Sequence, residues 1–356
     1  MFLNKFPRVN LGHFPTRLER LDAISKFMGG PEIWIKRDDC TGLATGGNKT
    51  RKLEFLIADA IKHNADTIIT QGATQSNHVR QTAAAAARHG MMCMGLLETR
   101  VPDLGPAYEL SGNVFLDELF ECRLESRPAG LDMNREAEIE AEKLRSEGKL
   151  VYVIPGGGSN PIGAMGYVRC MFELAGQLDA ENLAIDALVH ATGSAGTQAG
   201  LLAGAQLLGR SIPVIGVSVR ADREKQVANV KRLTKQTLSL MGLEPSDLRD
   251  ETVIAVDDQV GPGYGYPTDE TISAIRLMAN MEGILLDPVY SGKGFAGLIA
   301  MINRGEFRSG ERVVFLHTGG SAALPGYEEI FRNHRSKINI DKIFSNKIVN
   351  FMSNSL

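Results

Sequence analysis

Cysteine is scarce in this sequence. Its 356 residues include four cysteines, Cys40, Cys93, Cys122 and Cys170, and no two of them have CxxC spacing. No histidine cluster accompanies them, so they do not predict a zinc site, and a disulfide framework is not expected in a chain of this length. We therefore expect no bound metal and a reducing, cytoplasmic location.

Long apolar runs and basic runs are also missing. No apolar run reaches the roughly 20 residues that a membrane-spanning helix needs. Residues 1–14 contain two basic residues but lack the apolar core of a secretory signal. The net charge is −3, and no cluster of basic and aromatic side chains is present. We expect neither a nucleic acid nor a membrane as partner.

Glycine, in contrast, is abundant, and many of the 38 glycines follow short apolar runs. These runs predict buried strands at residues 33–36, 67–70, 92–97, 150–154, 187–191, 214–219 and 312–316. Helical patterns include residues 50–62, 79–88, 133–146, 163–178, 198–208 and 269–282. Alternating strands and helices predict an α/β fold with parallel sheets covered on both faces. The length suits two such domains.

Residues 192–198 form one of the glycine-rich turns, between a predicted strand and a predicted helix. Small residues let backbone N–H groups converge on an anion, and the helix N-terminus adds a favourable dipole. Ser194 and Thr197 supply hydroxyl donors. The segment lacks the lysine of a P-loop and the dinucleotide fingerprint, so it predicts a different phosphate-binding turn. A tight turn with an N-cap remains the alternative.

Lys49 follows two glycines at the start of a predicted helix. The helix N-terminus disfavours a nearby cation and would lower the pKa of the amine. A neutral amine is what Schiff-base chemistry requires. The alternative is an ordinary surface lysine. The next cations, Arg51 and Lys52, are expected to be solvated or paired with Glu54 and Asp59.

Four further loops have the same character. Residues 75–78, Gln-Ser-Asn-His, follow one predicted strand, and the others are residues 156–160, 261–265 and 317–321. Simple N-capping by Ser76 or Asn77 would explain the first of them. Six polar or glycine-rich loops, most of them at strand ends, are hard to explain as turns alone, because α/β enzymes place ligands at that edge of a sheet.

Together these segments resemble one family, the pyridoxal-phosphate (PLP) enzymes of fold type II. This tryptophan-synthase-β-like group includes 1-aminocyclopropane-1-carboxylate (ACC) deaminase, D-cysteine desulfhydrase and L-cysteate sulfo-lyase. The stretches that carry the resemblance are residues 36–40, 46–54, 75–81, 192–200, 287–290 and 317–320. They extend over nearly the whole chain.

The resemblance implies roles for individual residues. Lys49 looks like the lysine that binds PLP covalently, and Asn77 like the partner of the ring hydroxyl. Ser76 and His78 occupy positions that handle the substrate carboxylate, and Tyr264 and Tyr290 resemble the two active-site tyrosines. The residues that look like the phosphate loop are Gly193, Ser194, Ala195, Gly196 and Thr197.

Two positions bear on the substrate. ACC deaminases carry Glu and Leu where this chain has Ser291 and Thr318, whereas the sulfur-eliminating members carry Ser or Thr at both. We expect Ser291 to contact substrate and Thr318 to contact the cofactor. A carboxylate beside the pyridine nitrogen would make the ring a strong electron sink. A hydroxyl makes a weaker sink, which suffices for β-elimination because the leaving group takes the electron pair.

The resemblance is nearest to L-cysteate sulfo-lyases, on residues 39–50 and 72–76. We therefore expect release of sulfite from L-cysteate, with pyruvate and ammonia as the other products. D-cysteine desulfhydrase is the main alternative. ACC deaminase, a β-replacement synthase and a PLP-binding protein without turnover are weaker ones. Arg100 and Arg169 are candidates to bind a sulfonate, although either could be a surface arginine.

The expected mechanism begins when the substrate amine displaces Lys49. The freed amine then removes the Cα proton, Ser76 holds the carboxylate, and Tyr264 or Tyr290 relays a proton. We expect a small α/β domain at residues 50–160, a large PLP-binding domain from residues 1–49 and 161–335, and a tail at 336–356. The substrate would be a small amino acid, and a homodimer is usual in the family.

Overall fold

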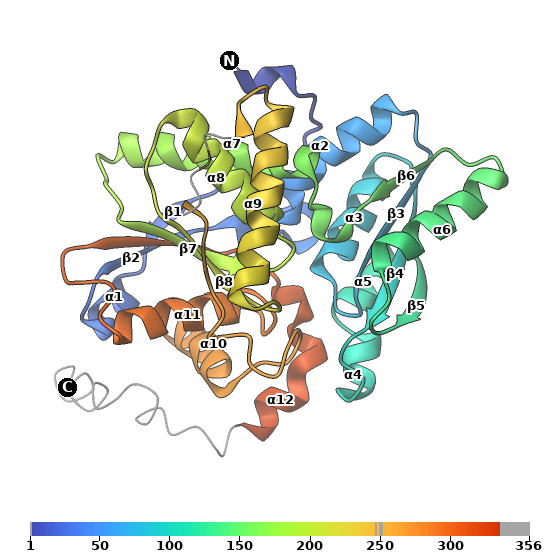
Figure 1. Ribbon diagram of the computed structural model, residues 1–356. Helices are drawn as coiled ribbons and strands as arrows, with labels where there is room; N and C mark the ends of the chain where they lie inside the picture. Colours follow the sequence, from blue (N-terminus) through green and yellow to red (C-terminus); the bar gives the residue numbers. More distant parts are fainter. Residues whose placement is uncertain (1, 246–247, 249–251, 335–356) are drawn as a thin grey trace.

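Two β-sheets, each covered by helices, make up the two halves of the molecule (Figure 1). The computed structural model describes residues 2–245, 248 and 252–334. The predicted tail at 336–356 lies outside the described residues. Every strand pair is parallel except β1 with β2, which confirms the expected α/β fold with parallel sheets.

The larger sheet has six strands in the order β1-β2-β10-β7-β8-β9. Their bounds are β1 Leu18–Arg20, β2 Glu32–Lys36, β7 Ala187–Thr192, β8 Val214–Ser218, β9 Ile254–Val256 and β10 Arg312–Leu316. All residues of β7 are buried. Such burial on both faces explains why β7, Ala-Leu-Val-His-Ala-Thr, lacks the alternation of apolar and polar residues that a half-exposed strand shows.

The smaller sheet has four parallel strands in the order β5-β4-β3-β6. Their bounds are β3 Thr67–Ala73, β4 Met92–Thr99, β5 Arg123–Pro128 and β6 Val151–Ile154. All four strands lie between residues 67 and 154, within the predicted small domain. The domain boundaries at residues 50 and 160 stay a prediction.

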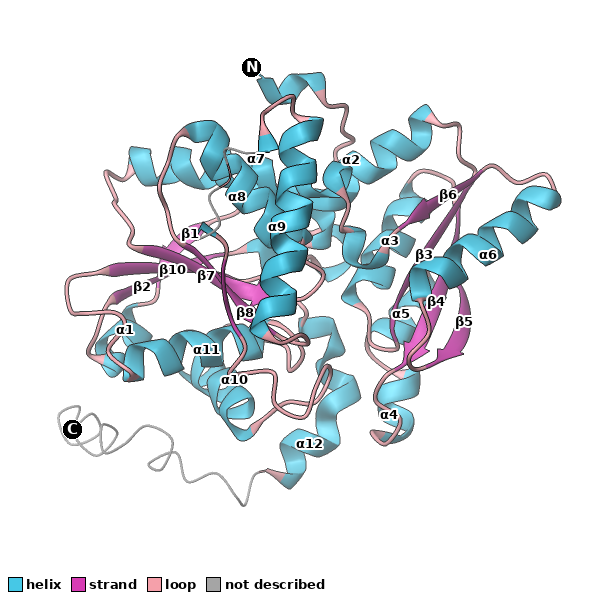
Figure 2. Ribbon diagram, viewed as in Figure 1, coloured by secondary structure: helices cyan, strands magenta, loops and turns pink. Residues whose placement is uncertain are grey.

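Helices cover both faces of each sheet (Figure 2). On the larger sheet, one face carries α7 Pro161–Ala180, α8 Gly196–Leu208 and α9 Arg223–Leu240; the other carries α1 Asp22–Met28, α10 Asp269–Glu282 and α11 Ser291–Asn303. On the smaller sheet, one face carries α2 Lys49–Lys62, α3 Asn77–Arg88 and α5 Asn113–Leu119; the other carries α6 Met133–Ser146. The short helices α4 Gly105–Leu110 and α12 Glu328–Asn333 lie near each other in Figure 1.

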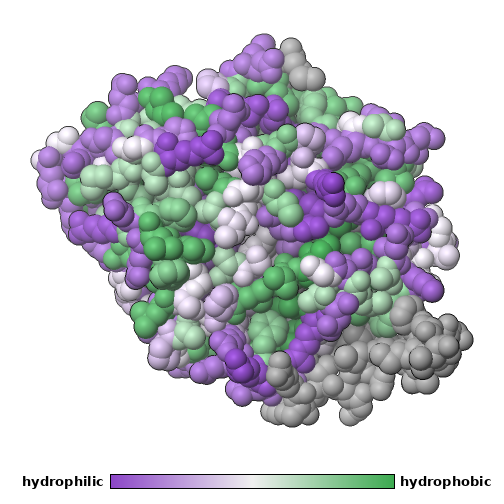
Figure 3. Space-filling model, turned by 180° about the vertical axis from the view of Figure 1, so that it is seen from behind, coloured by the Kyte–Doolittle hydropathy of each residue, from purple (hydrophilic) through white to green (hydrophobic). Residues whose placement is uncertain are grey.

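No helix among the described residues is long and apolar enough to span a bilayer. On the face shown in Figure 3, hydrophobic side chains form patches interspersed with polar ones. All four cysteines carry free thiols.

Candidate active site

The structure brings all six polar loops together at one place. They line two cavities that share the walls formed by Lys49, Asn77, Gly193, Ser194, Ala195 and Tyr290. The larger cavity has a volume of about 420 Å³, which falls in the usual range of ~300–1,000 Å³ for small-molecule sites. Two loops meet where Asn48 N donates to Thr318 O at 3.0 Å.

Lys49 is the first residue of α2 and lines both cavities. Its Nζ donates to Asn48 Oδ1 at 2.8 Å, and the residue is only 8% exposed, so it is not a surface lysine. Burial lowers the pKa of Lys49 to about 8, partly opposed by the charge of Asp287. The predicted lowering of the Lys49 pKa is therefore confirmed. Its largest cause is desolvation by burial, whereas we expected the helix N-terminus to be the cause.

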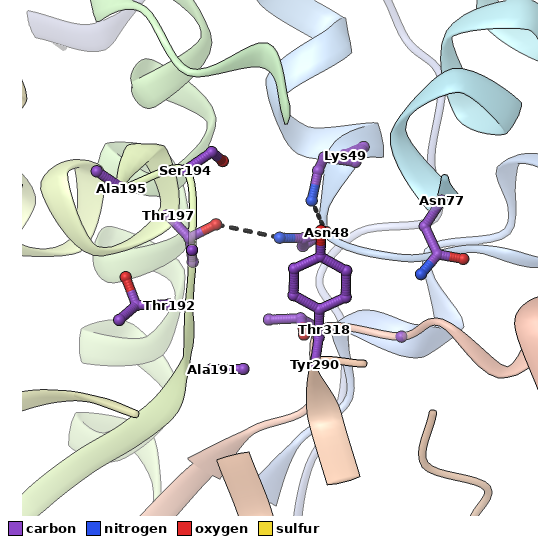
Figure 4. A pocket seen from close by; sticks show the side chains of 12 residues that line it. Asn48, Lys49, Asn77, Ala191, Thr192, Ser194, Ala195, Thr197, Tyr290 and Thr318 are labelled. Carbon is purple, nitrogen blue, oxygen red and sulfur yellow. Dashed lines mark hydrogen bonds between the residues drawn. The ribbon is translucent and has the colours of Figure 1, made fainter. Parts of the chain in front are cut away.

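Residues 193–197 connect β7 to α8, as the sequence predicted, and four of them line the smaller cavity (Figure 4). Ala195 has a left-handed backbone (φ 71°) just before the helix. Ser194 Oγ lies 2.8 Å from Ser159 Oγ, and Asn48 Nδ2 donates to Thr197 Oγ1 at 3.1 Å. The turn therefore exposes the first N–H groups of α8, which have no partner within the helix.

Lys52 is buried directly behind the turn at 193–197, a position that the sequence reasoning missed. It is 1% exposed, and its Nζ donates to Gly157 O at 3.0 Å and Ser159 Oγ at 3.3 Å. A Cβ built on Gly196 would lie 2.9 Å from this Nζ, so only glycine leaves room for the amine behind the turn. Burial, followed by the charge of Lys49, holds the pKa of Lys52 well below its usual value. Our expectation of a solvated or paired Lys52 was wrong.

Arg51 is also buried rather than solvated, and it does not pair with Glu54 or Asp59. Its Nε donates to Asp38 Oδ2 at 2.7 Å, and its Nη2 donates to Glu173 Oε1 at 2.8 Å. Asp38 lies two residues beyond β2, and Glu173 lies on α7. Arg51 therefore fixes the start of α2 against the larger sheet and the helix that covers it.

The Gln-Ser-Asn-His loop lies at the N-terminus of α3. Ser76 caps this helix by accepting from Val79 N at 3.2 Å, and it also lines the larger cavity. Capping therefore does not remove Ser76 from the cavity wall. A helix N-terminus of this kind suits a carboxylate.

Asn77 and His78 line the cavity beside Ser76. Asn77 Oδ1 accepts from Arg80 Nη1 at 2.8 Å, which leaves its amide NH₂ directed toward the pocket in Figure 4. His78 Nε2 lies 2.8 Å from Thr70 Oγ1, which donates to Ile154 O. Burial, then the charges of Lys49 and Lys52, holds the pKa of His78 well below its usual value, so the ring is neutral.

Tyr264 and Tyr290 form a pair in the larger cavity. Their hydroxyl oxygens are 2.7 Å apart, and their rings meet edge to face with centroids separated by 5.7 Å. The Nζ of Lys49 lies 5.7 Å from the centre of the Tyr290 ring. Burial raises the pKa of both phenols, so both stay protonated near neutral pH and can donate.

Some of the remaining predicted residues line the cavities, and others lie outside them. Thr318 lines the smaller cavity and Arg100 the larger one. Ser291 lines neither: its Oγ donates to Asp287 Oδ1 at 2.6 Å behind the wall, so the structure does not place it against substrate. Gly196 likewise lies behind the turn. Arg169 lies near Arg8, Glu54 and Glu173 rather than in either cavity, so it is not a sulfonate ligand.

The chemistry of these walls fits a phosphorylated aldehyde. Lys49 supplies the amine, and the four residues of the turn at 193–197 that line the smaller cavity supply donors for a phosphate. The free NH₂ of Asn77 can donate to a ring hydroxyl. Only small residues fit around the turn, because a Cβ on Gly157 would lie 2.3 Å from Ser194 Oγ.

Comparison with known proteins gives the same answer. The model of the pyridoxal-phosphate-dependent enzyme family matches residues 9–319. A D-cysteine desulfhydrase from Serratia proteamaculans (strain 568) is 44% identical over 328 residues, which cover 91% of this chain and 97% of the relative.

Two solved structures are similar as well. An ACC deaminase homologue superposes with a TM-score of 0.84 at 38% identity, covering 93% of this chain and 97% of that chain. A hydrogen sulfide-producing enzyme from Fusobacterium nucleatum, with a TM-score of 0.59 and 17% identity over 91% of this chain and 98% of that one, shares the fold. The chain therefore belongs to the pyridoxal-phosphate-dependent enzymes of fold type II, in the group that contains ACC deaminase and D-cysteine desulfhydrase.

Proposed function

We propose that this enzyme eliminates the sulfur substituent from the β-carbon of a small amino acid, with D-cysteine as the first candidate substrate. The observation that carries the proposal is a buried Lys49 amine, with a pKa lowered to about 8, between a phosphate-binding turn and a protonated tyrosine pair. The choice of D-cysteine rests on the 44% identical desulfhydrase. The products would be hydrosulfide, pyruvate and ammonia.

Each residue around the cavity has a task in this reaction. The bound cofactor supplies an electron sink for the substrate's Cα. Ser76 and the N-terminus of α3 hold the carboxylate, while the NH₂ group of Asn77 and the turn at 193–197 hold the ring and the phosphate. The freed amine of Lys49 removes the Cα proton, and its lowered pKa increases the neutral fraction of the amine near pH 7–8. The tyrosine pair is within reach to pass a proton.

L-cysteate is the second candidate substrate. The larger cavity is lined by Arg100, Arg220, Lys225 and Arg232 in addition to Lys49, and by a single carboxylate, Asp222. Such a cationic lining favours a substrate with a sulfonate in addition to its carboxylate. ACC deamination is a weaker candidate, because no carboxylate occupies position 291.

Incubation of purified holoenzyme with D-cysteine, L-cysteate and ACC in separate reactions tests the proposal. Sulfide with pyruvate supports the desulfhydrase, and sulfite with pyruvate supports the sulfo-lyase. Formation of 2-oxobutanoate from ACC would contradict both. Absence of product from all three substrates, in protein that shows the absorbance of bound cofactor, would favour a PLP-binding protein without turnover.

The Lys49→Ala variant tests the central residue. We expect it to lose the visible absorbance of covalently bound cofactor and nearly all pyruvate formation. Normal turnover in this variant would contradict the assignment. A homodimer, a cytoplasmic location and the domain division at residues 50 and 160 are proposed from the family resemblance, and sedimentation of the holoenzyme tests the first of these.

A further inference from the structure

Two arginines, one from each sheet, reach the larger cavity beside Tyr264. Arg100 directly follows β4 of the smaller sheet, and Arg220 lies two residues beyond β8 of the larger sheet. Both line the cavity together with Lys49 and Tyr264. The cavity wall therefore receives one arginine from each half of the molecule.

Arg100 is held in a fixed direction. Its guanidinium carbon lies 4.8 Å from the centre of the Tyr264 ring. Its Nε donates to Glu98, whose other oxygen accepts from Gly130 N at 3.0 Å. Neither terminal amino group of Arg100 has a hydrogen-bond partner among the described residues. Glu98 thus holds the guanidinium of Arg100 at Nε and leaves its two terminal amino groups available to bind a ligand.

Arg220 is solvent-exposed, and no carboxylate pairs with it in the described part of the chain. Burial raises the pKa of Tyr264, and the charge of Arg220 is close enough to oppose that rise. Among the described residues, Asp222 is the only carboxylate that lines the cavity, and it caps α9 by accepting from Lys225 N at 2.8 Å. The cavity is therefore cationic in a protein whose net charge is −3.

We propose that Arg100 and Arg220 form the subsite that binds the sulfur anion as it leaves the β-carbon. The inference rests on the proposed elimination reaction and names the part of the site that serves the leaving group. The ligand class is an anionic sulfur species, either hydrosulfide from cysteine or sulfite from cysteate. The protonated hydroxyl of Tyr264 lines the same cavity and adds a hydrogen-bond donor.

Electron balance explains why cations are needed there. The Cα proton passes to the Lys49 amine, the electron pair of the Cα–H bond forms the Cα–Cβ double bond, and the pair of the Cβ–S bond leaves on sulfur. A neutral thiol thereby becomes HS⁻, and a sulfonate with one negative charge becomes sulfite with two. Charge develops on sulfur in the transition state, so fixed donors accelerate the step.

The test uses the holoenzyme and four single variants. Arg100→Gln and Arg220→Gln remove one cation each, and Arg223→Gln is the matched control, because Arg223 is exposed on the first turn of α9 and does not line the cavity. Arg220→Lys tests whether charge alone restores function. Pyruvate formation from D-cysteine and L-cysteate gives kcat and KM, and inorganic sulfate serves as a competitive, unreactive probe of the anion subsite.

We expect Arg100→Gln and Arg220→Gln to lower kcat by about tenfold or more with whichever substrate reacts. The loss should be larger for L-cysteate, whose product carries two charges, and the inhibition constant of sulfate should rise by a similar factor. Arg220→Lys should recover part of the loss, and Arg223→Gln should match the wild type.

Unchanged kcat and unchanged sulfate inhibition in both glutamine variants would overturn the subsite. If a glutamine variant loses cofactor absorbance or has a lowered melting temperature, Arg220→Lys decides instead. An Arg220→Lys protein that binds cofactor like the wild type but has no higher kcat than Arg220→Gln would also contradict the proposal. If the wild type forms no pyruvate from either sulfur substrate, the proposed function fails instead. Sulfate affinity, measured by calorimetry on holoenzyme, would still test the two arginines.

Discussion

The surroundings of Lys49 bring the pKa of its amine close to neutral pH. Burial lowers its pKa to about 8, so below pH 8 the amine is mostly protonated and above it mostly neutral. Only the neutral amine attacks an aldehyde. We expect the rate at which apoprotein takes up PLP to rise about tenfold per pH unit below pH 8 and to level off above it. Stopped-flow absorbance from pH 6.5 to 9.5 measures this, and a flat profile would contradict the assignment.

The hydroxyl pair of Tyr264 and Tyr290 makes a second prediction. Tyr264→Phe keeps the ring that Arg100 covers but removes one oxygen from the 2.7 Å contact. We expect kcat for pyruvate formation to fall by about a hundredfold, within the usual range for a lost proton donor. Cofactor absorbance should stay unchanged, because neither the turn at 193–197 nor Lys49 is altered. A variant with wild-type kcat would exclude a proton-transfer role for this phenol.

Local motifs singled out Lys49, Asn77 and the turn at 193–197, which the structure brings together at one cavity, while their roles stay predictions. Lys52 escaped because its partners, Gly157 and Ser159, are more than a hundred residues away in the sequence. Ser291 was misplaced for a different reason. The turn from Asp287 brings that carboxylate onto the serine hydroxyl, which directs it away from the cavity.

Two glycines of helix α7 show how closely the elements are packed. A Cβ on Gly166 would lie 2.4 Å from the backbone carbon of Arg51 in α2, whereas a Cβ on the exposed Gly176 would meet nothing within 4 Å. We expect Gly166→Ala to cost about 1–3 kcal/mol through overpacking. Gly176→Ala should stabilise by about 0.5–1 kcal/mol, because alanine favours a helix. Urea unfolding of both variants tests the contrast, and equal effects would refute it.

Elements with a strong periodic pattern matched the sequence prediction. Helices α6 and α10 and strand β10 begin and end at the predicted residues. Strands β1 and β9 were not predicted because each has only three residues, and β5 was missed because Arg-Leu-Glu-Ser-Arg-Pro carries little apolar pattern. Helix α11 was hidden by its glycines, and Gly294 and Gly297 pack directly against Ala191 and Val217 of the larger sheet. Such contacts are decided by the tertiary fold.

At the scale of the whole molecule, a buried ion cluster joins α2 to the larger sheet. Arg51 binds Asp38 and Glu173 at once, and Lys36 also donates to Glu173. Arg51→Met would leave two carboxylates short of a partner, and we expect a loss of about 3–5 kcal/mol in the free energy of unfolding. Denaturant unfolding measures it. A loss below about 1 kcal/mol would mean that the cluster does not hold the halves together.

The same cluster sets a limit on acid stability. Burial alone would raise the pKa of Asp38, but the charge and hydrogen bonds of Arg51, the charge of Lys36 and the hydrogen bond from Tyr167 together outweigh it and lower the pKa to about 2. An acid whose pKa is lowered by folding stabilises the protein above its unfolded value near 4, and this contribution disappears as the pH falls through 2. We expect circular dichroism to show a stability loss between pH 4 and pH 2 that is smaller in Asp38→Asn. An identical acid profile in that variant would contradict this account.

The walls of the cofactor site come from loops as far apart in the chain as residues 48 and 319 and from both sheets. A ligand that binds Lys49 on one side and the turn at 193–197 on the other links the two halves of the molecule. At a concentration one hundred times its dissociation constant, such a ligand adds about 2.7 kcal/mol to stability. Chains that are made while vitamin B6 is in short supply should therefore unfold more often and be degraded sooner. The amount of this protein in a cell would then follow the vitamin supply without any change in its synthesis.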